Sequence, residues 1–135
     1  MGKLGGKVAI ITGGATGVGK GIARAFVNEG ATVVIASRNK EALEKTAAEL
    51  SANGGTVDFM PTDVTDEAQV AALLDVADEL GGVDVMINNA GLGGTASVLE
   101  MTDEQWSRVL DITLTGTFRC VRAAGQRMAA AGTRG

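Results

Sequence analysis

VAIITGGATGVGKGIARAF, residues 8–26, joins a short apolar run to a stretch of helical periodicity through five glycines in nine positions. Residues 7–12 predict a buried strand, and Val18, Ile22 and Phe26 recur at the spacing of one helix face. Free backbone N–H groups and the positive end of the helix dipole would meet at this loop, and glycine lets an anion approach the backbone closely. The stretch predicts a phosphate-binding loop, and the alternative is a glycine-rich turn that holds no ligand.

Apolar runs of strand length alternate with helical periods along the rest of the chain. Predicted strands cover residues 7–12, 32–37, 56–60 and 83–87, and one long final helix is expected over 103–130. Short links between strands and helices favour right-handed crossovers and a parallel sheet covered on both faces. We therefore predict an α/β fold in which residues 1–135 form one dinucleotide-binding domain, a doubly wound parallel sheet of about four strands in the order 3-2-1-4.

The composition limits the class of protein. A net charge of −4 without a basic block argues against nucleic acid or an anionic membrane as the main partner. Cys120 is the single cysteine, and no apolar run approaches the roughly 18 residues of a membrane span, so we expect a cytoplasmic protein. The chain has no histidine and no tyrosine, which removes the commonest general base and the phenolic acid/base. No metal site is predicted.

The spacing of the glycines distinguishes between two kinds of dinucleotide loop. The strict pattern G-x-G-x-x-G fails, because Ile22 stands where its third glycine would be. Residues 12–19, TGGATGVG, instead fit T-G-x-x-x-G-x-G. Residues 91–96, GLGGTA, match G-x-G-x-x-A, but no helical period follows them directly, so we predict a loop there.

Together with NNAG at residues 88–91, this pattern resembles the short-chain dehydrogenase/reductase family. The similarity runs from about Gly5 to Arg134, and two motifs in the right order are more specific than either alone. The resemblance implies a Rossmann-type fold and hydride transfer between a nicotinamide cofactor and a carbonyl or alcohol. Within the family, the pattern is similar both to carrier-protein ketoacyl reductases and to sugar or polyol dehydrogenases, and it does not distinguish between these two groups.

The residues after the second predicted strand bear on the choice between NAD and NADP, because they meet the adenosine ribose. No acidic residue lies between Ala36 and Glu41, whereas Arg38 offers a planar donor fork to a 2′-phosphate and Ser37 can add a hydroxyl. The alternative is that Arg38 is only a solvated charge. We expect NADP(H) to be preferred over NAD(H).

The resemblance also implies further cofactor contacts. Asp63 and Val64 match the contact to adenine, with the alternative that Asp63 only starts the helix ahead of Asp66. One residue of the pair Asn88 and Asn89 would brace the sheet, while the backbone lines the adenosine ribose. The predicted cofactor-binding residues are Gly13, Ala15, Thr16, Gly17, Val18, Gly19, Ser37, Arg38, Asp63, Val64, Asn89, Ala90 and Gly91.

The catalytic part of the family pattern has no match in these residues. The family's serine and its tyrosine and lysine four residues apart are absent, so we assign no catalytic residue. Thr113 stands where the family usually has an asparagine, and we expect it to face the core rather than relay protons. We predict a truncated cofactor-binding portion of an oxidoreductase, inactive alone, whose small-molecule substrate binds only when the missing segment completes it. A catalytically dead binding or assembly module and one half of a split enzyme remain alternatives.

The truncation also bears on assembly. Val83, Val85 and Ile87 would form an uncovered strand edge, and one face of the last helix would lack its cover. A bare apolar edge favours pairing with another copy. We therefore expect a homo-oligomer.

Overall fold

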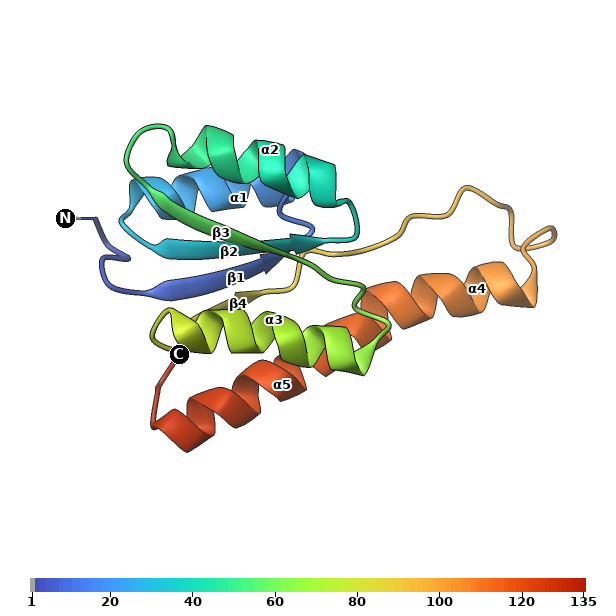
Figure 1. Ribbon diagram of the computed structural model, residues 1–135. Coiled ribbons are helices and arrows are strands. Elements are labelled where there is room, and N and C mark those ends of the chain that lie inside the picture. The colour runs from blue at the N-terminus through green and yellow to red at the C-terminus, as the bar shows by residue number, and fades with distance from the viewer. Residues whose placement is uncertain (1) are drawn as a thin grey trace.

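Four parallel strands form the middle layer of the computed structural model, which describes residues 2–135 (Figure 1). Three βα units come first, and a fourth strand leads through a long loop into the final helices. The elements in chain order are β1 (Val8–Thr12), α1 (Gly17–Asn28), β2 (Thr32–Ser37), α2 (Lys40–Ser51), β3 (Thr56–Pro61), α3 (Glu67–Glu79), β4 (Val85–Ile87), α4 (Asp103–Leu110), a π-helical turn (Asp111–Thr115) and α5 (Gly116–Ala131).

The strand order is β3-β2-β1-β4, so the predicted order 3-2-1-4 is confirmed. In the parallel register, Ile10 of β1 lies beside Val34 of β2 on one side and Met86 of β4 on the other. All four strands therefore end at the same edge of the sheet. The loops that follow β1, β2, β3 and β4 meet there, and that edge is where an open parallel sheet binds ligands.

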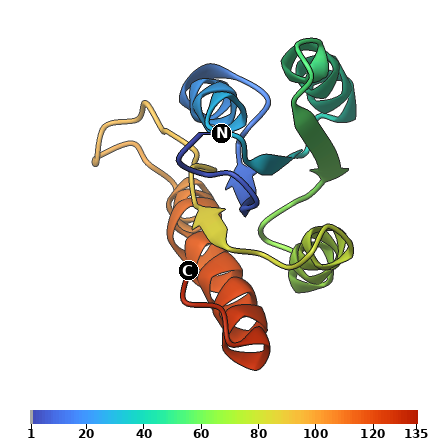
Figure 2. The same cartoon turned by 90° about the vertical axis from the view of Figure 1, so that its left-hand side faces the viewer.

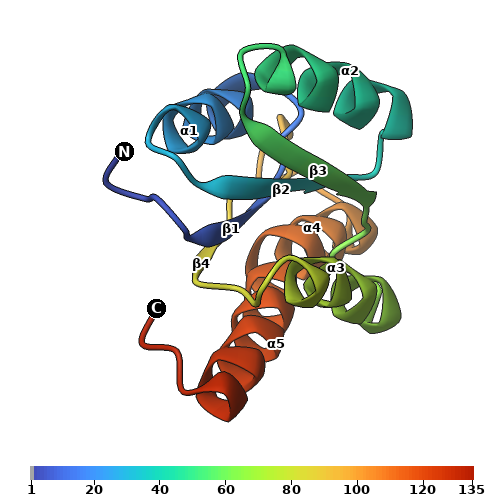
Figure 3. The same ribbon diagram turned by 60° about the vertical axis from the view of Figure 1, so that its left-hand side comes forward.

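Helices cover both faces of the sheet (Figures 2 and 3), and successive strand residues pack toward opposite helical layers. Ile11 and Ile35 pack under α1 and α2, with Leu43 of α2 fully buried among them. Ile10 and Val34 face α3 and α5. Both faces of β1 and β2 are thus buried, which explains why the inner residues of these strands are all apolar instead of alternating with polar ones.

The final helical region differs from the single helix expected over 103–130. A π-helical turn, Asp111–Thr115, separates α4 from α5, and the Gly116 N–H donates to the carbonyl of Asp111 five residues earlier. The apolar periodicity continues through DITLT, so the sequence pattern does not mark the extra residue in this turn. The predicted Thr102–Gln105 capping box is present, with reciprocal hydrogen bonds of 3.2 and 2.9 Å.

The fourth strand is shorter than predicted. Only Val85–Ile87 pair with β1, whereas Val83 is buried against the core before the strand begins. Asp84 explains this start, because its N–H donates to the Val8 carbonyl while its carboxylate accepts from the Val8 N–H, at 2.9 Å each. Among the helices of residues 2–135, none has the length and apolarity to cross a membrane.

Candidate functional site

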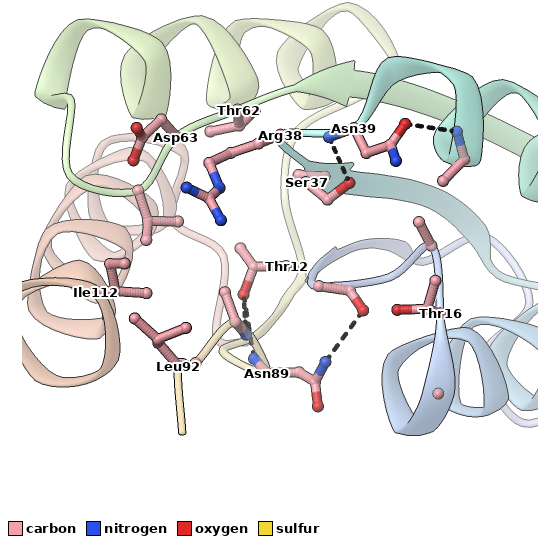
Figure 4. Close-up of a pocket in the computed structure, with 18 of the residues that line it drawn as sticks. Thr12, Thr16, Ser37, Arg38, Asn39, Thr62, Asp63, Asn89, Leu92 and Ile112 are labelled. Carbon is pink, nitrogen blue, oxygen red and sulfur yellow. Dashed lines mark hydrogen bonds between the residues drawn. The ribbon is translucent and has the colours of Figure 1, made fainter. Parts of the chain in front are cut away.

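A cavity of about 540 Å³ opens where the strands end (Figure 4). This volume lies within the usual range for small-molecule sites. The loops after all four strands contribute to its wall, and Ile112 of the π-helical turn completes it. Of the thirteen predicted cofactor residues, the cavity brings together twelve: Gly13, Ala15, Thr16, Gly17, Val18, Ser37, Arg38, Asp63, Val64, Asn89, Ala90 and Gly91.

The glycine loop is held by hydrogen bonds to β2, to α2 and to the segment after β4. The Gly13 N–H donates to the Ala36 carbonyl at 2.7 Å, the Thr46 hydroxyl donates to the Ala15 carbonyl at 2.8 Å, and Asn89 reaches the loop from β4. Gly13 and Gly17 have φ values of +65° and +54°, which glycine adopts without strain. The loop is therefore fixed in a conformation that residues with a Cβ adopt only at a cost.

The amino end of α1 opens onto this loop, and no side chain among residues 2–135 caps it. The side chain of the N-cap residue Thr16 makes no capping hydrogen bond, and the first turn carries no acidic residue. Val18 is 74% exposed although it is apolar, and it lines the cavity. Unpaired N–H groups at a helix end suit an anion, and an exposed apolar side chain beside them suits a ring or a sugar.

Gly19, the thirteenth predicted residue, does not line the cavity. It is buried, and a Cβ there would overlap the carbonyl oxygen of Gly13 and lie 2.6 Å from Nδ2 of Asn89. Its physical role is close packing of α1 against the loop. The contact of Gly19 with the cofactor stays a prediction, and the structure adds that a glycine here lets α1 approach the loop closely.

Arg38 extends into the cavity toward the side where Asp63 lies (Figure 4). Its guanidinium takes part in none of the ion pairs within residues 2–135, so it is available to a ligand. Ser37 accepts a hydrogen bond from the Asn39 N–H at 3.4 Å, and Asn39 caps α2 by accepting from Ala42 N–H at 3.1 Å. The turn after β2 thus presents to the cavity the guanidinium of Arg38, which has no ion-pair partner within residues 2–135.

Asp63, which follows the neighbouring strand β3, lines the cavity with a carboxylate that is fixed in place. The Thr65 N–H and hydroxyl donate to its Oδ1 at 2.9 and 2.7 Å, and these bonds, with the nearby Arg38 and Arg108, hold the pKa of Asp63 below its ordinary value. Asp66, not Asp63, caps α3 by accepting from two backbone N–H groups. Asp63 therefore does not cap α3, although it orders the turn ahead of the helix, and its carboxylate lies at the cavity wall.

Asn89 and Ala90 form the remaining wall, and Thr12 holds them there. The Thr12 hydroxyl accepts from both N–H groups at 3.1 and 2.9 Å, and Asn89 Nδ2 donates to the Gly13 carbonyl at 3.2 Å. The brace is therefore Asn89 tying β4 to the glycine loop. The side-chain oxygen of Asn88 is buried without a hydrogen-bond partner in residues 2–135.

Several cavity residues were not predicted as cofactor residues. Thr12 lies within the glycine motif and could have been found there, whereas Leu92 and Ile112 carry no signal beyond being apolar. The additional lining residues are Thr12, Ala36, Asn39, Ala42, Thr62, Leu92 and Ile112.

Thr113 was expected to face the core, and that expectation is wrong. The residue is exposed, and its hydroxyl accepts from the Leu92 N–H at 3.1 Å. The π-helical turn changes the direction of the helix surface at this position, so the side chain meets the loop after β4 rather than the sheet.

Comparison with known proteins agrees with this geometry. The family model described as short chain dehydrogenase matches residues 7–135. The chain is 51% identical over 126 residues to a (5R,7aS)-5-hydroxy-7a-methyl-1-oxo-2,3,5,6,7,7a-hexahydro-1H-indene-carboxyl-CoA reductase of Mycobacterium tuberculosis, covering 91% of this chain and 48% of the relative. It is 43% identical to an NADP-dependent (R)-specific alcohol dehydrogenase of Lentilactobacillus kefiri, covering 93% and 50%.

A solved structure extends the comparison. The crystal structure of a short chain dehydrogenase from Mycobacterium smegmatis superposes with a TM-score of 0.92 at 42% identity, covering 96% of this chain and 55% of that one. The chain spans about half the length of the curated relatives it matches. On the matched residues, the strand order and the sequence motifs together, this chain belongs to the short-chain dehydrogenase family.

Proposed function

We propose that residues 1–135 are the dinucleotide-binding domain of an NAD(P)-dependent oxidoreductase that transfers a hydride between a nicotinamide and a carbonyl or alcohol substrate. The observation that carries the proposal is the cavity at the carboxyl ends of the strands, where an open helix end, a free guanidinium and a fixed carboxylate lie around one space. Membership of the short-chain dehydrogenase family supports the class of reaction.

Each wall of the cavity fits one part of a dinucleotide. The loop from Gly13 to Val18 and the amino end of α1 would hold the pyrophosphate, because backbone N–H groups and the helix dipole favour negative charge. The ionised carboxylate of Asp63 would accept a hydrogen bond from the adenine amine. Ala90 and Gly91 would leave room for the ribose. The bound nicotinamide would supply or accept the hydride.

We propose NADP(H) rather than NAD(H) as the preferred cofactor. Arg38 is a donor fork without an ion-pair partner within residues 2–135, and Ser37 adds a hydroxyl beside it. No acidic residue at the end of β2 is present to accept from a free ribose 2′-hydroxyl. A relative that is 43% identical is described as NADP-dependent, which supports this choice.

We propose that this polypeptide binds the dinucleotide without turning over substrate. Its sequence contains no tyrosine, and no serine matches the position expected from the family pattern. Substrate binding and proton transfer would then require residues beyond these 135. A catalytically dead binding module and a split enzyme share this expectation for the isolated chain, and addition of a second polypeptide that restores turnover would favour the split enzyme.

We further propose a homo-oligomer in the cytoplasm. Four large apolar side chains at intervals of four residues are exposed along α4, the π-helical turn and α5: Trp106, Leu110, Leu114 and Phe118. Water-exposed apolar stripes of this kind favour association. The only cysteine, Cys120, is buried, and burial raises the pKa of its thiol to about 11, which is consistent with a free thiol in a reducing compartment.

Titration of the purified polypeptide with NADPH tests the proposed function. Val18→Asp is the decisive variant, because Val18 is 74% exposed and a carboxylate there would repel the pyrophosphate without disturbing the core. We expect at least a tenfold loss of affinity, whereas Val98→Asp, at a 92% exposed position outside the cavity, leaves it unchanged. Absence of dinucleotide binding by the unmodified chain at millimolar concentration would overturn the proposal.

A further inference from the structure

The segment Asn89–Leu92 forms one wall of the cavity but belongs to no helix or strand. Its position therefore depends on side chains that reach it from other elements. At its first end, the Thr12 hydroxyl accepts from the N–H groups of Asn89 and Ala90. This contact alone leaves the second end of the wall without support.

Thr113 of the π-helical turn supplies that support. Its hydroxyl accepts from the Leu92 N–H at 3.1 Å and lies 3.5 Å from the Leu92 carbonyl oxygen as a donor. The backbone carbonyl of Thr113 in turn accepts from the Thr117 hydroxyl at 2.8 Å. One threonine hydroxyl therefore holds each end of the wall.

The same turn is also linked, through the first residues of α5, to the Val64 wall of the cavity. Arg119 donates to the Val64 carbonyl at 3.1 Å and pairs with Asp111, the first residue of the turn, at 2.9 Å. Gly116, directly after the turn, packs so closely on Val64 that a Cβ there would lie 2.6 Å from a Val64 methyl. Val64 follows Asp63, so this packing fixes the carboxylate wall.

We propose that the π-helical turn Asp111–Thr115 is a positioning element of the dinucleotide site, with Thr113 holding the Asn89–Leu92 wall and Asp111 with Arg119 holding the Val64 wall. An extra residue in a helical turn rotates the rest of the helix by about 100°, so a regular helix would not let Thr113 face Leu92 while Gly116 and Arg119 face Val64. Turns of this kind occur frequently at functional sites. The identity of the ligand rests on the function proposed above.

Thr113→Val tests the first contact because valine keeps the shape and removes the hydroxyl. Loss of one hydrogen bond is expected to weaken NADPH binding about threefold to tenfold and to speed hydrogen exchange of the Leu92 amide by a similar factor. Thr113→Ser should restore both values. Thr115→Val is the matched control, because it removes a threonine hydroxyl from the same turn. The Thr115 hydroxyl takes part in none of the hydrogen bonds found within residues 2–135. Arg119→Gln tests the second contact and should also weaken NADPH binding.

The readouts separate this inference from the proposed function. If the unmodified chain binds no dinucleotide, the proposed function fails, and the exchange rate of the Leu92 amide still reports whether Thr113 holds the wall. If NADPH binds but Thr113→Val and Arg119→Gln leave its affinity unchanged, the positioning role is overturned while the proposed function stands. Equal effects of Thr113→Val and Thr115→Val on affinity and exchange would also overturn it, because they would indicate general loosening of the turn.

Discussion

Arg38→Ala should remove most of the preference for NADPH over NADH. A charge-assisted hydrogen bond is worth about 1.5–3 kcal/mol, which corresponds to roughly 10- to 100-fold in affinity. One feature of this cavity places the effect near the lower end: Arg38 is exposed, so solvent screens its charge. We therefore expect NADPH to weaken about tenfold and NADH to change little.

Calorimetric titration of both cofactors at low and high salt gives the measurement. The difference between NADPH and NADH should shrink as salt rises, because the contact is electrostatic and exposed. Arg38→Lys should keep part of the preference, since an ammonium retains the charge but not the planar fork. Arg134→Ala, at an exposed arginine outside the cavity, is the control. Equal affinity of the unmodified protein for NADH and NADPH would refute the reasoning.

Two further predictions concern pH dependence and assembly. Since the pKa of Asp63 is lowered by its bonds to Thr65, its contribution to stability is present above the ordinary value of 3.8 and is lost as the pH falls through the lowered pKa. Thermal unfolding of Asp63→Asn should therefore depend less on pH below about 4 than that of the unmodified protein, and equal dependence would contradict this. Leu114→Asp, at a 65% exposed position, should shift sedimentation toward the monomer while Val98→Asp does not. A stable monomer of the unmodified protein at roughly 50 μM would contradict the assembly proposal.

The parts of the fold that sequence reasoning predicts are those in which local pattern and tertiary environment agree. The bounds predicted for β2 are those observed, because its apolar run, residues 33–36, is buried on both faces. The strand order follows from the chirality of short crossovers. The start of β4 was misplaced because Val83 is apolar for a different reason, burial in the core ahead of the strand.

The π-helical turn could not be predicted from periodicity. Residues 111–115 extend the apolar pattern of a regular helix, and the tertiary contacts of the region, of Thr113 with Leu92 and of Arg119 with Val64, are not visible in that pattern. These contacts join positions 21 and 55 residues apart in sequence. Local pattern carries no information over such separations, so Thr113 was assigned to the core when it in fact supports the wall of the cavity.

The two motifs that identify the family are one structural unit, and this explains why their joint occurrence is informative. The side-chain amide of Asn89 in NNAG donates to the carbonyl of Gly13 in the glycine loop. Because Gly19 has no Cβ, there is room beside it for this amide and this carbonyl. Thr12, the first residue of the glycine motif, holds the N–H groups of Asn89 and Ala90. A change in either motif would therefore displace the other. The spacing of the glycines predicts this packing directly. The prediction of a phosphate ligand depends on a further consequence of the packing, which leaves the amino end of α1 open to the cavity.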